Sequence, residues 1–303
     1  MWIPAGTRRE HRELLTGPIE IHELPPLGVR TGPLGVGHFV VADFWRRDFA
    51  ETLRDLDDVR VVQAMSAGVE DLAGKVPSGA VLCDGAGIHD GPVAEWVVMA
   101  TLASRRHLAR HVLDQSGAVW KHPGLDGIDD LEGATVLIVG YGSIGRTLEA
   151  RLSPFGVRFL RVGLHARDGV AGAEELPSLL PQADVVVILL PLTQATEGFV
   201  DARFIASMRQ GALLVNPARG RIVDTEALAD ALEQGRVQAA IDVSDPEPLP
   251  PDHRLWRAPG VLITPHVAGS VSRAYERGWR FVSEQLQRYL AGEPLLNVVT
   301  NGY

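Results

Sequence analysis

The chain has 303 residues, enough for about two domains of ordinary size, and its 46% hydrophobic and 22% charged residues are typical of a folded globular protein. Acidic residues outnumber basic ones by 38 to 29, so the net charge of −9 argues against nucleic acid and anionic membrane surfaces as partners. The single cysteine, Cys83, cannot form an intramolecular disulfide, and the longest apolar run, Val185 to Leu192, is too short to span a bilayer. We therefore expect a cytoplasmic protein without a membrane or nucleic-acid partner.

The first hundred residues predict a small α/β unit. Three apolar segments have the length of strands, at residues 35–41, 59–62 and 81–83. From Pro92 the pattern becomes helical and continues to Val112, which predicts one long helix that bridges to the rest of the chain.

The middle of the chain predicts a parallel sheet. Its apolar runs are continuous, as expected for strands that helices cover on both faces, and the segments between them are long enough for helices. The predicted strands are residues 135–140, 157–162, 185–190, 212–216, 239–243 and 261–264. Six such strands make one complete doubly wound domain.

After the sixth strand, apolar residues recur from Tyr275 to Leu290 at helical spacing, and Gly292 predicts the end of that helix. We expect this helix to return to the N-terminal unit. The predicted fold class is therefore α/β with two Rossmann-like domains. A doubly wound parallel-sheet domain covers residues 93–270, and a smaller flavodoxin-like domain is formed by residues 1–92 plus 271–303.

A G-x-G-x-x-G motif follows the strand at 135–139 and precedes a helical pattern. Gly140 permits a tight turn, Gly142 lets backbone N–H groups approach a pyrophosphate, and Gly145 lets helix and strand pack closely. The alternative is a glycine-rich turn without a ligand, which the flanking strand and helix disfavour. The predicted cofactor contacts in this turn are Gly140, Gly142, Ser143, Ile144 and Gly145.

The end of the second strand of this domain bears on the choice of cofactor. An NAD site places a carboxylate there for the ribose hydroxyls, but here no acidic residue follows until Asp168, whereas Arg161, His165 and Arg167 are basic. Because arginine can bind a 2′-phosphate with two hydrogen bonds, we predict NADP as the cofactor, with contacts from Arg161 and Arg167. NAD remains possible if these cations are solvated loop residues.

Three polar residues stand at the carboxyl ends of later predicted strands, where doubly wound sheets bind their ligands. They are Arg219, Glu247 and His266. Each residue alone has an ordinary explanation, as a surface cation, a solvated carboxylate or a histidine within the core. The histidines show no metal-ligand spacing such as H-E-x-x-H, so no metal is predicted.

Together, in this order behind the glycine motif, these residues resemble the D-isomer-specific 2-hydroxyacid dehydrogenase family, and the resemblance covers most of the chain. The segments 155–160 and 246–250 are most similar to its glyoxylate/hydroxypyruvate reductase branch. The other matching segments are Ser66 to Val69, Val93 to Glu95, and Leu190 to Thr193 with Thr196. Two positions depart from the pattern, because Ser244 replaces a common aromatic residue and Asp90 lies where the family often has a threonine.

The resemblance implies a role for each catalytic residue in the reduction of a 2-oxo acid. Arg219 would hold the substrate carboxylate and polarise the ketone, and His266 would give a proton to the developing alkoxide. Glu247 would orient the imidazole and favour its charged form. The backbone N–H groups of Ala67 and Gly68 would also bind the carboxylate, which implies a substrate between the two domains.

Further cofactor contacts are implied by the same resemblance. Asp242 is expected near the nicotinamide carboxamide, and Pro191 and Thr196 near the ribose and phosphates, with Ala218 as a further contact. Two of these residues have ordinary alternatives, Asp242 as a cap at the end of a strand and Thr196 as a turn residue.

We therefore expect an NAD(P)-dependent D-2-hydroxyacid dehydrogenase for a small 2-oxo or 2-hydroxy acid, assembled as a homodimer through its cofactor domain. The alternative from another class is a dinucleotide-sensing binding protein of the corepressor type without significant turnover. A formate dehydrogenase is disfavoured because that branch pairs its histidine with glutamine, where this chain has Glu247.

Overall fold

The computed structural model describes residues 1–29, 32–44, 48–122 and 129–300. The chain forms two compact units, which are described separately. Unit 1 consists of Met1–His89 with Ser272–Tyr303, and unit 2 consists of Asp90–Val271.

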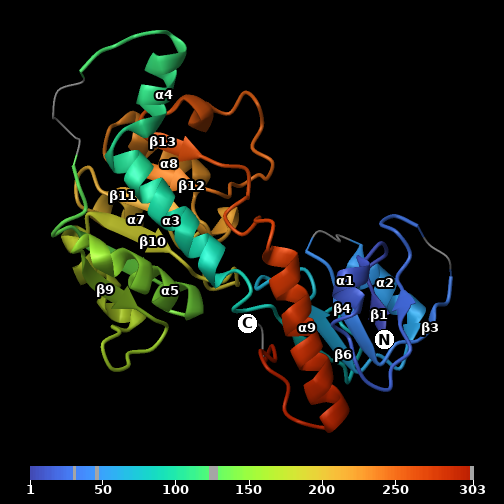
Figure 1. The fold of residues 1–303 in the computed structure, drawn as a ribbon. Coiled ribbons are helices and arrows are strands. Elements are labelled where there is room, and N and C mark those ends of the chain that lie inside the picture. Colours follow the sequence, from blue (N-terminus) through green and yellow to red (C-terminus); the bar gives the residue numbers. More distant parts are fainter. Residues whose placement is uncertain (30–31, 45–47, 123–128, 301–303) are drawn as a thin grey trace. The chain divides into compact units, whose positions relative to one another are not determined.

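Unit 2 is built on a six-stranded parallel sheet (Figure 1). Its strands are β8 (Thr135–Val139), β9 (Arg158–Val162), β10 (Val185–Ile188), β11 (Leu213–Asn216), β12 (Gln238–Ile241) and β13 (Val261–Ile263). The order across the sheet is β13-β12-β11-β10-β8-β9. Beyond β9, Val162 pairs in parallel with Ala171 through an isolated bridge. The chain order therefore reverses between β8 and β10, which is where doubly wound sheets bind ligands.

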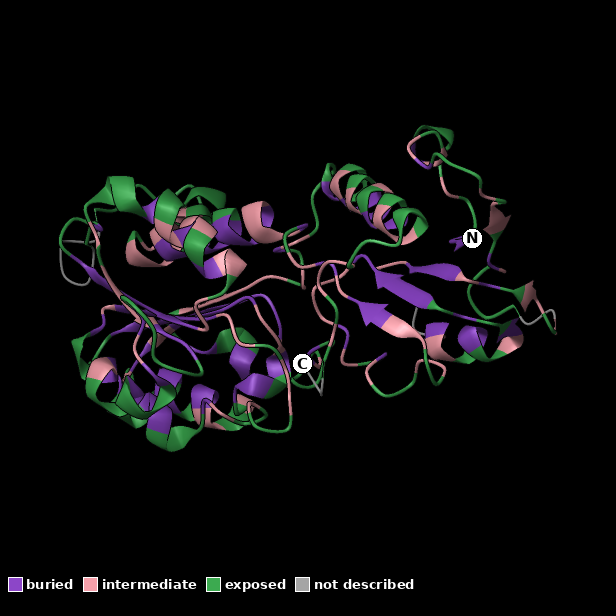
Figure 2. Ribbon diagram, turned by 90° about the horizontal axis from the view of Figure 1, so that it is seen from below, coloured by how far each residue is buried: buried purple, intermediate pink, exposed green. Residues whose placement is uncertain are grey.

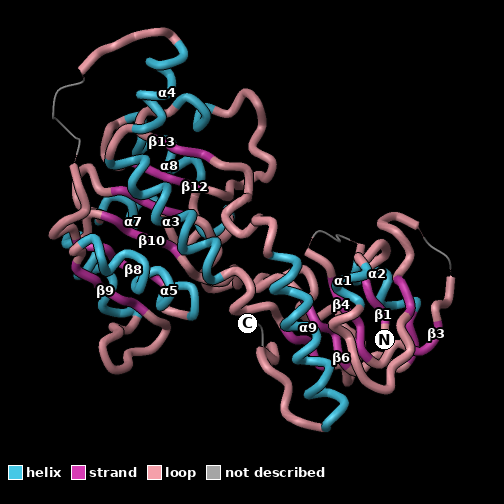
Figure 3. The backbone as a smooth tube through the Cα atoms, in the orientation of Figure 1, coloured by secondary structure: helices cyan, strands magenta, loops and turns pink. Residues whose placement is uncertain are grey.

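Helices cover both faces of this sheet, which explains the continuous apolar runs of its strands (Figures 2 and 3). Alternate residues of a strand face opposite sides, so Val136 packs with the helices α3 (Asp90–Arg105) and α5 (Ser143–Leu152), whereas Leu137 packs with the other group. The other group consists of α6 (Leu176–Leu179), α7 (Ala202–Ser207) and α8 (Thr225–Glu233).

The prediction of one continuous helix from Pro92 to Val112 is wrong, because the structure has two helices there. The structure divides it into α3 and α4 (Leu108–Ser116), because His107 takes a left-handed conformation with φ of +50°. Neither Gly nor Pro marks the break, so the sequence carries no local signal for it.

Unit 1 contains a five-stranded parallel sheet in the order β2-β1-β4-β6-β7. The strands of this sheet are β1 (Trp2–Ile3), β2 (His22–Glu23), β4 (Phe39–Ala42), β6 (Val61–Ala64) and β7 (Val81–Cys83). Numbered along the chain, this is the 2-1-3-4-5 order of flavodoxin. The predicted strand at 35–41 is split in two, because β3 (Gly35–Val36) pairs separately with β5 (Leu56–Asp57).

The described residues of unit 1 include the helices α1 (Arg9–Arg12), α2 (Phe49–Thr52) and α9 (Ala274–Ala291). The predicted C-terminal helix is confirmed by α9, which ends at Gly292 in a left-handed cap with φ of +69°. Trp279, Val282 and Leu286 of α9 pack on buried residues of the first ninety positions. The chain then runs back to β7, where Val298 forms an antiparallel bridge with Cys83. The C-terminal segment is therefore part of the N-terminal unit. The predicted fold class is confirmed in both units.

Candidate active site

The glycine motif forms the turn between β8 and α5, at the point where the strand order reverses. Gly140 has φ of +96°, and a Cβ atom there would lie 2.6 Å from the carbonyl oxygen of Leu189. At Gly145 a Cβ would touch Ile138 at 3.3 Å, so this glycine lets α5 pack against β8. Gly142 faces open space at the start of α5. A helix N-terminus with free space in front of it fits the pyrophosphate of a dinucleotide.

Ser143 and Ile144 occupy the first turn of α5. The hydroxyl of Ser143 donates a hydrogen bond to Oδ1 of Asp90, the first residue of α3, at 3.1 Å. The sequence singled out Asp90 only as a departure from the family pattern. The structure places its carboxylate beside the phosphate-binding turn.

The two arginines predicted to bind a 2′-phosphate have different surroundings. Arg161 on β9 donates to both carboxylate oxygens of Glu149, at 2.6 and 2.5 Å, and Tyr141 donates to the same carboxylate at 2.7 Å. Arg167 lies in the exposed loop after β9 and donates to the carbonyl of Tyr141 at 2.5 Å. Arg161 thus has an internal carboxylate partner, whereas Arg167 lies directly over the glycine turn.

Arg219 is held by the loop that follows β11. The side chain of Asn216, buried at the end of this strand, donates to the Arg219 carbonyl at 3.0 Å and accepts from the Ala218 N–H at 3.1 Å. Gly220 brings the loop against the chain after β12, because a Cβ there would lie 1.9 Å from the Ser244 carbonyl oxygen. The loop that carries Arg219 is therefore packed onto the segment that leads to Glu247.

Glu247 and His266 are in direct contact. The imidazole Nδ1 lies 2.7 Å from Glu247 Oε1, and both side chains are about two-fifths exposed, at 38% and 44%. His266 has φ of +55°, a conformation that costs energy for a residue with a side chain and that occurs often at functional sites. With Nδ1 bonded to Glu247, the opposite nitrogen Nε2 is the one that can exchange a proton with a substrate.

Asp242 fixes the loop that carries His266. Its side chain is 1% exposed, and its two oxygens accept hydrogen bonds from the N–H groups of Val267 at 2.9 Å and Ala268 at 2.7 Å and from the Thr264 hydroxyl. Its backbone carbonyl also accepts from the N–H of His266 at 2.7 Å. These bonds give Asp242 a structural role at the end of β12, and its contact with the nicotinamide stays a prediction.

Pro191 and Thr196 lie in the turn after β10. The Thr196 hydroxyl donates to the Pro191 carbonyl at 2.6 Å and accepts from the Thr193 N–H at 2.8 Å, so it closes the turn. Their contacts with a ribose or phosphate stay predictions.

In unit 1, Ala67 and Gly68 follow β6 at its carboxyl end. The Ser66 hydroxyl donates to the Gly68 carbonyl at 2.7 Å, and the Ser66 carbonyl accepts from Gly85 at 2.8 Å. These bonds tie the loop to the chain after β7.

In residues 1–29, 32–44, 48–122 and 129–300, no helix is both long and apolar enough to cross a membrane. Within the same ranges, no three or more His, Cys, Asp or Glu side chains form a group able to hold a metal ion.

A parallel doubly wound sheet with a phosphate-binding turn and an Arg, Glu and His at its carboxyl edge defines a dinucleotide-dependent oxidoreductase. The family model of the D-isomer specific 2-hydroxyacid dehydrogenase NAD-binding domain matches residues 98–268, more than half of the chain. The chain therefore belongs to the D-isomer specific 2-hydroxyacid dehydrogenase family, as the motifs predicted, and is an NAD(P)-dependent dehydrogenase acting on CH–OH groups.

Two sequence relatives of this chain, at nearly equal identity to it, have different activities. The chain is 33% identical over 258 residues to a glyoxylate reductase of Thermofilum pendens, with 80% of this chain and 76% of the relative covered. It is 32% identical over 255 residues to the formate dehydrogenase of Arabidopsis thaliana, with 80% and 66% covered.

Among solved structures, the chain is similar to the NADPH-dependent glyoxylate/hydroxypyruvate reductase of Sinorhizobium meliloti, in complex with NADP and sulfate. The two are 25% identical, with a TM-score of 0.83 and 98% and 97% of the chains covered. A nicotinamide dinucleotide as the cofactor is thus supported by both family and structure.

Sequence reasoning gave no structural role to three residues that shape the site, namely Asn216, Asp90 and Glu149. Asn216 ends the predicted strand at residues 212–216, three positions before Arg219, and a polar residue that ends a buried strand is a usable signal. Asp90 and Glu149 had no such signal, because their partners lie 53 and 12 residues away.

Proposed function

We propose that the protein reduces a small 2-oxo acid of the glyoxylate or hydroxypyruvate type to the D-2-hydroxy acid, with NADPH as the preferred cofactor. The observation that carries this proposal is the contact of 2.7 Å between His266 and Glu247, beside the loop of Arg219. An imidazole that is held by a carboxylate is suited to transfer a proton.

Each of these residues has a separate role in the proposed reduction. The guanidinium of Arg219 binds the substrate carboxylate and polarises the ketone oxygen. A nicotinamide cofactor held at the glycine turn would supply the hydride for the carbonyl carbon. His266 gives the proton from Nε2 to the oxygen. Glu247 holds Nδ1 and balances the positive charge of the ring before that transfer. Ala67 and Gly68 keep their predicted role of binding the carboxylate through backbone N–H groups.

The identity of Glu247 favours this reaction over formate oxidation. Formate loses only a hydride on its way to carbon dioxide, so that reaction needs no proton donor. A carboxylate that holds and orients an imidazole suits a reaction in which a proton moves. Glu247 in contact with His266 therefore supports ketone reduction, although formate dehydrogenases are among the relatives.

The NADPH preference rests on the loop after β9. Arg167 is exposed and lies at the carbonyl of Tyr141 in the glycine turn, and the first carboxylate after the strand is Asp168. A guanidinium in this place would bind a 2′-phosphate, and the reductase of Sinorhizobium meliloti was solved with NADP. Arg161 supports the preference less, because its Nε and one of its terminal nitrogens already donate to the Glu149 carboxylate.

We further propose that two copies associate through unit 2, in agreement with the sequence prediction of a homodimer. The support is α4, in which no residue is buried although it carries Leu108, Val112 and Leu113. A helix of nine residues is unstable alone in water, so its apolar side chains need a partner. The cytoplasmic location stays a prediction.

The test is a kinetic screen that crosses NADPH and NADH with formate and a panel of about ten 2-oxo acids. We expect turnover of glyoxylate or hydroxypyruvate with NADPH, and a product of the D configuration. Tight NADPH binding without turnover of any acid would favour the sensor function instead. Oxidation of formate in preference to reduction of every 2-oxo acid would overturn the proposal. His266→Gln, compared with His253→Gln outside the site, checks that turnover depends on the proposed donor.

A further inference from the structure

Asp43 is the first residue after the strand β4 of unit 1, and it is half-buried. Its Oδ1 atom accepts two hydrogen bonds, from the N–H of Phe44 at 2.7 Å and from the hydroxyl of Tyr275 at 3.2 Å. Both donors are uncharged, so neither of them balances the negative charge of this carboxylate. Among the described residues, both hydrogen bonds to Asp43 reach Oδ1, which leaves Oδ2 to accept a hydrogen bond from a ligand.

The ring of Tyr275 is held in place so that its hydroxyl stays at Asp43. It lies 5.1 Å from the ring of Phe44, edge to face, and 6.3 Å from the ring of His11, stacked. Burial and the Asp43 carboxylate raise the pKa of Tyr275 to about 12, so its hydroxyl is a donor at neutral pH. Rings on two sides limit the movement of Tyr275, and its hydroxyl therefore fixes the orientation of the carboxylate.

Asp43 leaves the sheet beside the loop that is proposed to bind the substrate carboxylate. Ala42 and Ala64 are paired in register and are the last residues of the neighbouring parallel strands β4 and β6. Asp43 follows the first of these strands, and the loop of Ala67 and Gly68 follows the second. Adjacent strands lie about 4.8 Å apart, so a 2-oxo acid whose carboxylate is bound at this loop has its third carbon within reach of Asp43.

The helix α9 joins these two loops. A Cβ atom at Gly278 of α9 would lie 3.4 Å from the sulfur of Met65 and 3.5 Å from the ring of Phe44. Met65 follows β6 directly and Phe44 follows Asp43, so the chain after both strands packs on the helix that carries Tyr275. The pair of Asp43 and Tyr275 is therefore part of the same packed cluster as the start of the proposed carboxylate-binding loop.

We propose that Asp43 selects the substrate by the group on its third carbon. Its Oδ2 atom accepts a hydrogen bond from a hydroxyl or ammonium group there, and its charge rejects 2-oxo acids with a second carboxylate. Tyr275 is the positioning residue that holds Asp43 for this contact. The inference rests on the proposed function and narrows it to 2-oxo acids with a hydrogen-bond donor on the third carbon. Glyoxylate has no third carbon and should be a poorer substrate than hydroxypyruvate.

The first test compares kcat/KM for hydroxypyruvate, pyruvate and 3-fluoropyruvate. Pyruvate lacks the hydroxyl, and 3-fluoropyruvate carries a fluorine that withdraws electrons as the hydroxyl does but cannot donate a hydrogen bond. We expect the parent to prefer hydroxypyruvate about 30-fold or more over both, since a site that accepts a hydrogen bond discriminates against analogues that lack the donor. The intrinsic reactivity of the three acids cancels when each ratio is compared between the parent and a variant.

Two variants remove the contact in different ways. Asp43→Ala should lower kcat/KM for hydroxypyruvate about 30-fold and change the values for the other two acids less than threefold. Tyr275→Phe keeps the ring but removes the hydroxyl that holds Oδ1, so hydroxypyruvate should lose about fivefold and pyruvate nothing. This variant keeps the test valid if Asp43→Ala does not fold. Asp57→Asn is the matched control, because Asp57 is an exposed carboxylate of the same unit on β5.

The second test addresses the charge of Asp43. Oxaloacetate carries a second carboxylate on its third carbon, and Asp43→Asn removes the charge while keeping the size of the side chain. The variant should raise kcat/KM for oxaloacetate about tenfold relative to pyruvate. Added salt should raise the same ratio in the parent but not in the variant, because salt screens the repulsion between two carboxylates.

The outcomes separate this inference from the proposed function. A structural role of Asp43 would lower kcat/KM for every acid alike, and that result in Asp43→Ala and Tyr275→Phe would overturn the inference. An unchanged ratio of oxaloacetate to pyruvate in Asp43→Asn would overturn it as well. In both cases the turnover of 2-oxo acids by the parent would still support the proposed function. A parent that turns over no 2-oxo acid would overturn both.

Discussion

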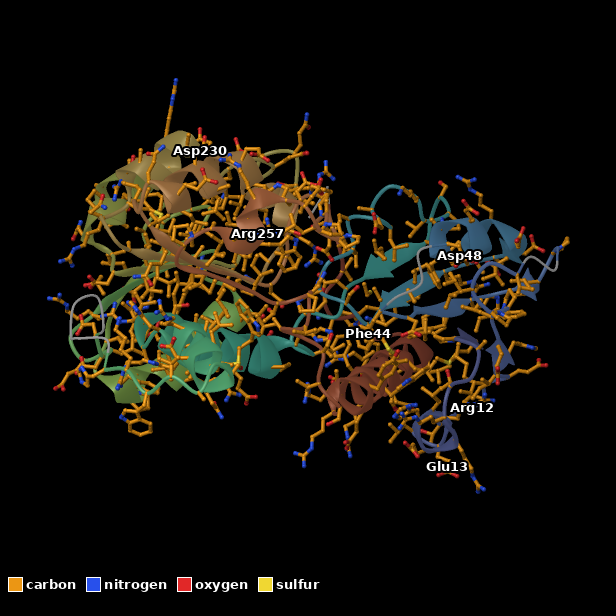
Figure 4. All side chains as sticks on the ribbon, turned by 90° about the horizontal axis from the view of Figure 1, so that it is seen from above. Arg12, Glu13, Phe44, Asp48, Asp230 and Arg257 are labelled. Carbon is orange, nitrogen blue, oxygen red and sulfur yellow. The ribbon has the colours of Figure 1, made fainter. Side chains whose placement is uncertain are left out.

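Both units hold the loops at the carboxyl ends of their parallel strands with buried polar side chains, and unit 1 adds a cluster of aromatic rings. In unit 2, buried polar side chains do this, with Asn216 bonded to the Arg219 loop and Asp242 to the His266 loop. In unit 1, the buried Gln63 donates to the carbonyls of Ala64 at 2.8 Å and Asp84 at 3.0 Å. The ring of Phe44, which is labelled in Figure 4, lies 5.1 Å from those of Tyr275 and His89.

The contrast also appears in the family match, which covers residues 98–268 and so lies within unit 2. Hydrogen bonds fix direction and distance, as a proton transfer requires, whereas apolar packing tolerates changes of shape. We therefore expect variants in unit 2 to change the rate for every substrate and variants in unit 1 to change the preference among substrates.

The largest effect is expected for Arg219→Ala. It removes both the carboxylate contact and the polarisation of the ketone, so kcat/KM should fall on the order of 10²–10⁴-fold for every 2-oxo acid. Arg221→Ala is the control, since Arg221 lies two residues on and pairs with Glu197. A loss of less than threefold at Arg219 would show that its role is misassigned.

Asp242→Asn should have the next largest effect. The amide would present N–H groups where Val267, Ala268 and Thr264 now donate to a carboxylate. We expect a loss of about 2–3 kcal/mol in the free energy of unfolding and at least a tenfold fall in kcat, because the His266 loop loses its fixed position. Denaturant titration and steady-state kinetics measure the two effects. Asp245→Asn, at an exposed neighbour, should change neither by more than the error.

Phe44→Ala tests the expectation that variants in unit 1 change the preference among substrates. The half-buried ring packs on Tyr275 and His89, and Gly278 gives it room on α9. Burial and the Asp43 carboxylate raise the pKa of Tyr275 to about 12, so its hydroxyl stays protonated and keeps donating to Asp43. We expect a loss of about 1–2 kcal/mol of stability and a shift of about tenfold in relative kcat/KM toward bulkier 2-oxo acids. An equal change for every acid would contradict the contrast between the units.

The two arginines of the β9 region give a sharper test of cofactor choice than either alone. Arg167→Ala should weaken NADPH about tenfold and leave NADH unchanged, because only NADPH carries the 2′-phosphate. Arg161→Ala should instead lower stability, since it leaves Glu149 without its bidentate partner. Dissociation constants for both cofactors decide the matter, and equal losses for NADH and NADPH at Arg167 would refute the phosphate contact.

Part of the fold and of the site could be predicted from apolar patterning and glycine spacing in the sequence. The strands β8, β10 and β11 were predictable because each is a run of apolar residues that is buried throughout, and the glycine turn because Gly140 and Gly145 are needed for close backbone approach. The strands β1 and β2 have only two residues each and gave no periodic signal.

The features that the sequence did not predict depend on contacts between residues that lie far apart in the chain. Nothing near Arg161 in sequence predicts that Glu149 on α5 binds its guanidinium, and nothing near Leu108 predicts that His107 ends α3. The contact of Glu247 with His266 joins residues 19 positions apart, and only the register of β12 and β13 brings their loops together.

The smallest effect is expected for Glu149→Gln, and its size depends on pH. The hydrogen bonds from Arg161 hold the pKa of Glu149 below its usual value of about 4.5. A carboxyl group with a lowered pKa in the folded state adds stability above its unfolded pKa and loses this contribution as the pH falls through the folded value. At pH 7 the variant should be less stable by about 1 kcal/mol, a modest amount because water reaches the pair. The difference should shrink below pH ~4.5 and vanish once the carboxyl is protonated in both states.

Glu132→Gln, at an exposed position of the same unit, serves as the control. Urea titrations of the parent and both variants between about pH 3 and 7 measure this, and a constant difference across that range would show that the Arg161 pair contributes no charge-dependent stability.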